Sequence, residues 1–160
     1  MKATIAFILL LFHLLVWSAC SNSDTTTPNQ VTEEVITEND EVMKDTITIT
    51  IGTRTFKAVL ESNETAAQFK SMLPLSLNMQ DLNSNEKFFD FADGLPTNPS
   101  NPRTINSGDL MLWQSNTLVM FYKSFSTSYN YTRLGKIENP SGLAEALGSG
   151  DVNVKFDLQK

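Results

Sequence analysis

The chain has 160 residues, a formal net charge of −6 and 41% hydrophobic residues, which is enough for one domain with a proper core. An acidic balance repels nucleic acid, so no nucleic-acid partner is expected. The chain contains one cysteine, Cys20, and one histidine, His13, and both precede the segments with strand and helix patterns. This excludes an intrachain disulfide and a histidine–cysteine zinc site, and we expect neither a metal nor a cofactor.

The N-terminal segment has the pattern of an export signal. Lys2 precedes an almost wholly apolar run, Ala3 to Val16, which is shorter than the roughly 20 residues of a membrane-spanning helix. Trp17-Ser18-Ala19-Cys20 then resembles the bacterial lipobox, in which a cysteine after a small residue receives lipid before cleavage. We therefore predict that residues 1–19 are a lipoprotein signal peptide and that lipid on Cys20 anchors the protein at a membrane of the bacterial cell envelope. An uncleaved anchor and an exported protein with a free thiol are the alternatives.

Residues 20–45 are rich in Ser, Thr, Asn, Glu and Asp. Such a composition cannot bury enough apolar surface to offset the entropy lost on ordering. As a flexible coil, the segment would span roughly 25–30 Å. We predict a disordered tether that separates a folded domain, residues 46–160, from the membrane.

The first elements of this domain are two strands and a helix. Thr and Ile alternate strictly from Thr46 to Ile51, as in a half-buried strand. Gly52-Thr53 predicts a tight turn, after which residues 55–60 form a second strand. Asn63 is suited to cap a helix that ends before Pro74.

Short strands dominate the rest of the domain. Alternating or aromatic-rich segments predict strands at residues 75–79, 87–91, 110–113, 117–122, 134–137 and 152–158. Three prolines predict a surface loop over residues 92–107, and Pro140 and Gly148 suit the two ends of a second short helix. Many short strands with two short helices indicate a mainly β fold, either a β-barrel or a strongly curved sheet.

Two parts of the domain resemble cyclophilins. Gly135-Lys136-Ile137, followed by residues 142–150 and a last strand, is similar to the end of the cyclophilin chain. Gly108 to Trp113, with Leu118 to Tyr122, is similar to the aromatic hairpin of a compact bacterial cyclophilin-like family. The resemblance covers about residues 46–158, and it implies a closed cyclophilin-like β-barrel of about eight strands with two short helices.

Cyclophilins are peptidyl-prolyl isomerases, and the resemblance implies a mechanism that lowers a rotation barrier of about 20 kcal/mol. An arginine of the family hydrogen-bonds the proline nitrogen, and it lies in a Phe-His-Arg segment after the first helix. Residues 75–81 occupy that place here and contain neither arginine nor histidine. Arg103, in the proline-rich loop, and Arg133, beside an aromatic segment, are the remaining catalytic candidates. Arg54, at a hairpin turn, is expected to be solvated.

The segment Lys123 to Tyr131 mixes hydroxyl groups with aromatic rings, a composition typical of ligand-binding surfaces. The candidate ligand-binding residues are aromatic side chains of this segment and of the preceding hairpin: Trp113, Phe121, Tyr122, Phe125 and Tyr129. The alternative is that these rings cover an open end of the barrel and that Trp113 is a core residue.

Paired carboxylates are a further candidate chemistry. Glu86 with Asp90, and Asp81 with Asp109, are the candidate pairs, but a glycosidase-like role requires a defined separation and a raised pKa. We interpret all four as solvated acids.

Together these patterns predict a monomeric, membrane-anchored cyclophilin-like domain that binds a peptide or a small-molecule ligand. A divergent peptidyl-prolyl isomerase that acts as an exported folding factor is the alternative. A third interpretation is a purely structural domain of an envelope complex, with its aromatic segment buried.

Overall fold

The computed structural model describes residues 45–159, so the predicted signal peptide, Cys20 and almost all of the predicted tether lie outside the described residues. Within this range the strands are β1 (Thr46–Ile51), β2 (Arg54–Leu60), β3 (Leu75–Leu82), β4 (Glu86–Asp90), β5 (Thr104–Ile105), β6 (Asp109–Trp113), β7 (Thr117–Phe121), β8 (Phe125–Ser126), β9 (Thr132–Ile137) and β10 (Val152–Leu158). The helices are α2 (Glu64–Ser71) and α3 (Leu143–Leu147).

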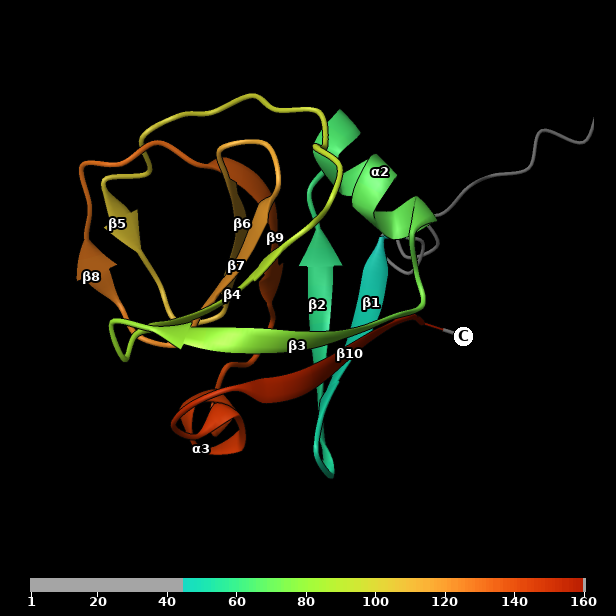
Figure 1. Ribbon diagram of the computed structural model, residues 1–160, viewed down its shortest axis with the longest axis vertical. Helices are drawn as coiled ribbons and strands as arrows, with labels where there is room; N and C mark the ends of the chain where they lie inside the picture. The colour runs from blue at the N-terminus through green and yellow to red at the C-terminus, as the bar shows by residue number, and fades with distance from the viewer. Residues whose placement is uncertain (1–44, 160) are drawn as a thin grey trace, which may run out of the picture. The chain divides into compact units, whose positions relative to one another are not determined.

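Eight of these strands form a closed antiparallel barrel in the order β1-β10-β3-β4-β7-β6-β9-β2 (Figure 1). The helices lie near opposite ends of the barrel, with α2 beside the upper ends of β1 and β2 and α3 below β10 in the view of Figure 1. The predicted closed, mainly β barrel of about eight strands with two short helices is confirmed for the described residues.

Local sequence signals account for most of these elements. The isoleucines of β1 are buried at 0–3% exposure, as the strict alternation predicts. Asn63 caps α2, because its side-chain Oδ1 accepts a hydrogen bond of 2.9 Å from the backbone N–H of Ala66. Gly148 ends α3 with a positive φ of 57°, a conformation that glycine adopts without a Cβ penalty.

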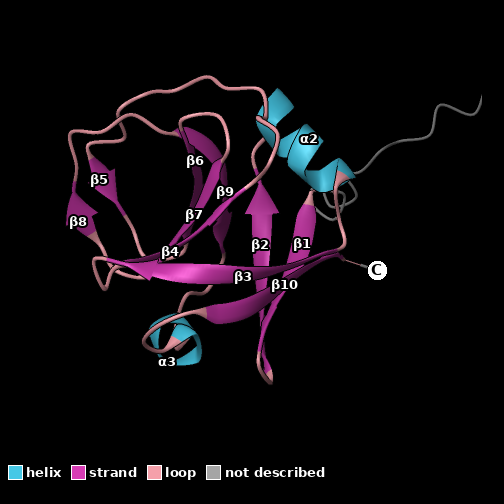
Figure 2. Ribbon diagram, in the orientation of Figure 1, coloured by secondary structure: helices cyan, strands magenta, loops and turns pink. Residues whose placement is uncertain are grey.

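The predicted loop over residues 92–107 is not wholly irregular. It contains β5, which pairs with β8 through Thr104 opposite Ser126 and Ile105 opposite Phe125 (Figure 2). Ile105 is fully buried in an apolar cluster that lies outside the barrel. Burial of this side chain explains why the proline-rich loop folds back onto the aromatic segment that contains β8.

Two apolar clusters pack on the two faces of the barrel wall. The larger one fills the barrel and includes Phe69 of α2, whose ring meets that of Phe156 edge to face at 5.7 Å. The second, the outer cluster, consists of Ile105, Met111, Val119, Phe121 and Tyr131, with Phe88 and Phe125 packed against it. Strand β7 lies between the two, and all five of its residues are buried.

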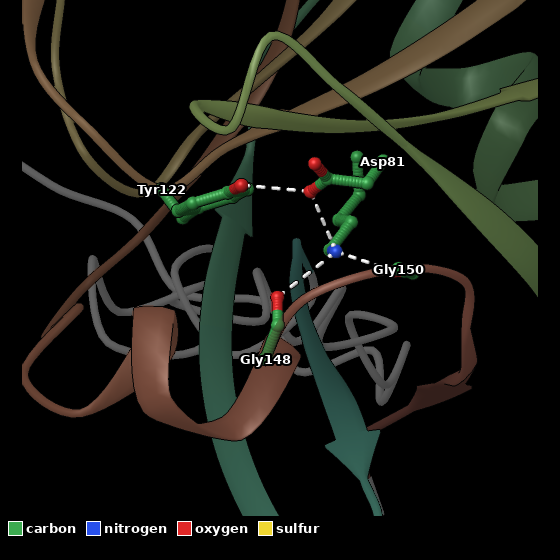
Figure 3. Close-up of polar contacts among 5 residues, drawn as sticks. Asp81, Tyr122, Gly148 and Gly150 are labelled. Atoms are coloured by element: carbon green, nitrogen blue, oxygen red, sulfur yellow. Dashed lines mark hydrogen bonds and ion pairs between the residues drawn. The ribbon is translucent and has the colours of Figure 1, made fainter.

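Lys87 of β4 is the most deeply buried charge in the described part of the chain, with 0% exposure. Its Nζ donates hydrogen bonds to Asp81 Oδ1 at 2.7 Å, to the Gly148 carbonyl at 3.0 Å and to the Gly150 carbonyl at 2.6 Å (Figure 3). These three bonds use all three ammonium protons. Lys87 therefore ties β3 and β4 to the turn between α3 and β10.

Tyr122, the residue after β7, completes this group. Its hydroxyl donates to the same Asp81 oxygen at 2.7 Å, and the Lys87 ammonium lies 5.6 Å from the centre of its ring (Figure 3). The hydrogen bonds from Lys87 and then from Tyr122 hold the pKa of Asp81 below its ordinary value of 3.8. Burial, followed by the bond to Asp81, raises the pKa of Tyr122 to about 12. Both groups therefore keep their ordinary charge states at neutral pH.

Lys87→Met should lower the free energy of unfolding by about 2–4 kcal/mol, because it leaves two buried carbonyls without this donor and the Asp81 carboxylate without its ammonium partner. Lys155→Met is the matched control, since Lys155 pairs with Asp157 on the surface and is 55% exposed. That substitution should cost less than about 1 kcal/mol. Urea unfolding measures both, and equal effects would contradict a structural role for the Lys87 bonds.

Candidate functional site

A cavity of about 410 Å³ opens on the outer face of the barrel, between the β3–β4 turn and the segment that follows β8. Its walls combine aromatic and aliphatic side chains with a few polar groups, and the lining residues are Leu82, Asn83, Glu86, Phe88, Asp90, Trp113, Thr117, Val119, Tyr129 and Tyr131. Most of its lining surface is apolar, as in pockets for small ligands and peptide side chains.

Strand alternation brings these residues together. Glu86, Phe88 and Asp90 are alternate residues of β4, so their side chains project from the same face. In the β4–β7 register, Phe88 lies opposite Val119 and Asp90 lies opposite Thr117. The β6–β7 pairing places Trp113 opposite Thr117 as well, so three adjacent strands form the floor of the cavity.

Aromatic side chains form the walls of the cavity, and they differ in how firmly the surrounding residues hold them. Tyr131 is only 7% exposed, and its ring meets Phe121 edge to face at 5.6 Å, so the outer cluster holds it in place. Trp113 and Tyr129 are 40% and 66% exposed. Tyr131 therefore offers a fixed wall, whereas Trp113 and Tyr129 present accessible aromatic surface at the rim.

Glu86 and Asp90 face the same cavity in different environments. Glu86 is 9% exposed, and its side-chain carboxylate has no hydrogen-bond partner among the described residues. Burial, followed by the negative charge of Asp81, raises its pKa above the ordinary value of 4.5. Asp90 is exposed, and its Oδ1 accepts a hydrogen bond of 2.6 Å from the Thr117 hydroxyl. Glu86 is thus the carboxylate whose hydrogen-bonding capacity is left unused.

The candidate ligand-binding residues divide between three locations. Trp113 and Tyr129 line the cavity. Phe121 and Phe125 lie behind its wall in the outer cluster, with ring centres 5.7 Å apart. Tyr122 belongs to the barrel interior, where it bonds Asp81.

Neither catalytic candidate among the arginines lines the cavity. Arg103 and Arg133 are both exposed, and Arg103 has a positive φ of 62°. Arg54, expected to be solvated, is exposed but donates a hydrogen bond of 2.8 Å to the Gly142 carbonyl. Strand β3 is the strand expected to carry the family's arginine. It contributes Leu82 to the cavity lining.

The interpretation of the four acids as solvated is wrong for Glu86 and Asp109, and Asp81 is half-buried and accepts hydrogen bonds from Lys87 and Tyr122. Glu86 is buried against the cavity, and Asp109 is 1% exposed, with its Oδ2 accepting a 2.8 Å bond from the Asn106 N–H. Their burial could not be read from sequence, because it depends on strands that are distant along the chain.

Sequence reasoning also missed the apolar part of the floor, Phe88 and Val119, and the fixed wall, Tyr131. Part of this arrangement could have been predicted from the sequence. Glu86, Phe88 and Asp90 alternate, so a strand assignment from residue 86 predicts that they share a face. Which face covers the barrel core, however, depends on the pairing partners.

Among known protein families, the family model described as "Cyclophilin-like family" matches residues 49–157. The chain belongs to the cyclophilin-like family. The match extends from β1 to β10 and therefore includes every strand that forms the cavity of this cyclophilin-like barrel. A search of curated proteins finds no match.

Residues 45–159 of the cyclophilin-like domain contain neither a helix suited to span a membrane nor a metal-binding cluster. None of the helices between residues 45 and 159 is long and apolar enough to cross a membrane. The same part of the chain contains no group of three or more His, Cys, Asp or Glu side chains placed to hold a metal ion.

Glu86→Gln should raise the melting temperature at pH 7 and leave it nearly unchanged at low pH. A carboxyl whose folded pKa is raised contributes stability that is present below the unfolded value, 4.5, and lost as the pH rises through the folded pKa. The isosteric amide removes this penalty, while the acid-linked loss from Asp81 is common to both proteins and cancels in their difference.

Thermal melts at several pH values between 3 and 8 measure this difference. Glu145→Gln on the exposed side of α3 is the matched control and should change little at any pH. A lower melting temperature for Glu86→Gln at pH 7 would contradict the destabilising burial of Glu86.

Proposed function

We propose that this cyclophilin-like domain is a binding module that takes a peptide or a small-molecule ligand in its outer cavity and is anchored to a bacterial membrane by lipid on Cys20. The observation that carries the binding role is the cavity itself, about 410 Å³ with mainly apolar walls and a few convergent polar groups. Such pockets are typical ligand sites when a rigid scaffold supports them. Here the scaffold is a closed barrel.

The position of the arginines favours binding over isomerisation. The three arginines of the chain lie at residues 54, 103 and 133, all within the described range, and none lines the cavity. A prolyl peptide in the cavity would therefore meet no guanidinium group able to hydrogen-bond its proline nitrogen. The cavity offers shape, aromatic surface and carboxylates instead.

The membrane anchor rests on the sequence alone. A basic start, a short apolar run and Ser-Ala before Cys20 are typical of a lipoprotein signal. Each buried methylene of an acyl chain contributes about 0.8 kcal/mol, and two or more chains hold a protein at a membrane stably. The polar segment after Cys20 would then let the domain reach ligands near the membrane surface.

Ligand binding can be measured at one reporter. Residues 45–160 contain all strands of the closed barrel and Trp113 as their single tryptophan, so one indole N–H resonance reports on the cavity. Three compounds of similar shape serve as probes: 3,3-dimethylbutan-1-ol, choline and 3,3-dimethylbutanoate, which are neutral, cationic and anionic. At least one should shift this resonance saturably.

Tyr129→Ala removes a rim residue and should weaken this binding about fivefold, or about 1 kcal/mol. Leu158→Ala is the matched control, because Leu158 is an exposed apolar residue of β10, at 48%, that does not line the cavity. If none of the three probes shifts the Trp113 resonance, the cavity is not a binding site. Acceleration of cis–trans exchange in a prolyl tetrapeptide, lost in Arg103→Ala or Arg133→Ala, would replace the binding role with isomerisation.

Expression of the full chain in a bacterial host tests the anchor. Mass spectrometry of the membrane fraction should find a mature chain that begins at Cys20 and carries acyl groups, and Cys20→Ser should abolish both acylation and cleavage at this site. A mature chain with a free Cys20 thiol would contradict the proposal.

A further inference from the structure

We infer that the outer cavity is built for an organic cation, because an unpartnered, nine-tenths buried Glu86 and four aromatic rings line it together. The inference rests on the proposed binding function and names the chemical class of its ligand. A ligand of this class carries an alkylammonium, trimethylammonium or guanidinium group on an apolar body.

The charged side chains that line the cavity are all acidic. Two carboxylates, from Glu86 and Asp90, face the cavity, and no lining residue is basic. The nearest basic residue along β4 is Lys87, but its ammonium group lies on the other face of the strand, bonded to Asp81 and two carbonyls. The other titratable groups that face the cavity are the hydroxyls of Tyr129 and Tyr131. Among residues 45–159, therefore, no cation neutralises Glu86 from within the cavity.

The state of Glu86 distinguishes this cavity from an acidic surface patch. A buried polar group without a partner costs free energy, and the cost is larger for a charge. Asp90 reduces its own cost through exposure and the Thr117 hydrogen bond. Glu86 is only 9% exposed and its carboxylate accepts no hydrogen bond from residues 45–159, so a ligand that donates a hydrogen bond or a positive charge would stabilise a carboxylate that is poorly solvated in the free protein.

The aromatic residues match the same ligand class. Cations are attracted to the faces of aromatic rings within about 6 Å, and tryptophan is the strongest partner. Phe88, Trp113, Tyr129 and Tyr131 line the cavity, and the two at its rim are partly exposed. A cation with methyl or methylene groups would thus bury its apolar surface against the rings that also attract its charge.

Other ligand classes fit these groups less well. Calcium takes six to eight oxygen ligands, whereas this cavity offers two carboxylates among mainly apolar walls. An anion would be repelled by both acids. A neutral apolar ligand would exclude water from Glu86 and leave it without a partner, at an energetic cost.

Isosteric pairs of ligands test the inference with the indole resonance of Trp113 as the reporter. Choline should bind at least tenfold more tightly than its neutral isostere 3,3-dimethylbutan-1-ol. N-acetyl-arginine amide and the neutral N-acetyl-citrulline amide form the second pair, and they represent the basic side chain of a peptide. A preference for choline over the arginine derivative indicates a small quaternary amine as the ligand, and the reverse indicates a basic peptide.

Glu86→Gln should reduce the affinity for choline at least tenfold and should not weaken binding of 3,3-dimethylbutan-1-ol. In the unmodified protein, choline affinity should fall as the pH is lowered through the range in which Glu86 is protonated. The Glu86→Gln variant should lose that part of the pH dependence. Glu145→Gln is the control and should bind all four compounds as the unmodified protein does.

Trp113→Leu provides a second variant that does not depend on charge removal. Because this variant lacks the indole reporter, its ligand binding is measured through backbone amide resonances. The substitution should weaken choline binding more than binding of the neutral isostere, because leucine keeps apolar contact but offers no ring face. Equal affinity for choline and its isostere would overturn the cation inference while the binding function stands. Failure of every probe to bind would overturn both.

Discussion

Strand β7 is buried on both of its faces, and the position of the cavity depends on this constraint. Leu118 and Met120 pack into the barrel, whereas Val119 and Phe121 pack outward. A β-barrel normally needs only one apolar face. The second apolar face draws the proline-rich loop and the aromatic segment over the outside of β6 and β7, and the cavity opens beside the region that they cover.

Strand β4 divides its charged residues in the same way. Lys87 turns inward and has every ammonium proton bonded, whereas the carboxylate of Glu86, the preceding residue, turns outward and has no hydrogen-bond partner in the described part of the chain. The contrast separates two roles for buried charge. A fully bonded charge holds elements together, whereas an unbonded one reduces stability and remains available to a ligand. Natural proteins tolerate such a loss of stability mainly where function requires it.

The family relationship explains the fold, whereas the cavity is the evidence for a binding function. Membership of the cyclophilin-like family accounts for the barrel and its two helices. Function has to be argued from the site, since one fold supports many activities. No arginine lines this cavity. Its lining consists of carboxylates, aromatic rings and a few other side chains. The chemistry of the lining therefore differs from one built to hydrogen-bond a proline nitrogen.

The sequence by itself determined the local elements: the alternation of β1, the Asn63 cap of α2 and the Gly148 end of α3 are short-range signals that act within a few residues. It also indicated the family, through the hairpin at residues 108–122 and the segments from Gly135 onward. Only the tertiary structure decided which aromatic residues reach the cavity, because the successive residues Phe121, the last of β7, and Tyr122 pack on opposite sides of the barrel wall. The burial of Glu86 was decided in the same way, since its surroundings come from β3, β7 and the segment before β9, and strand pairing over long separations brings these together.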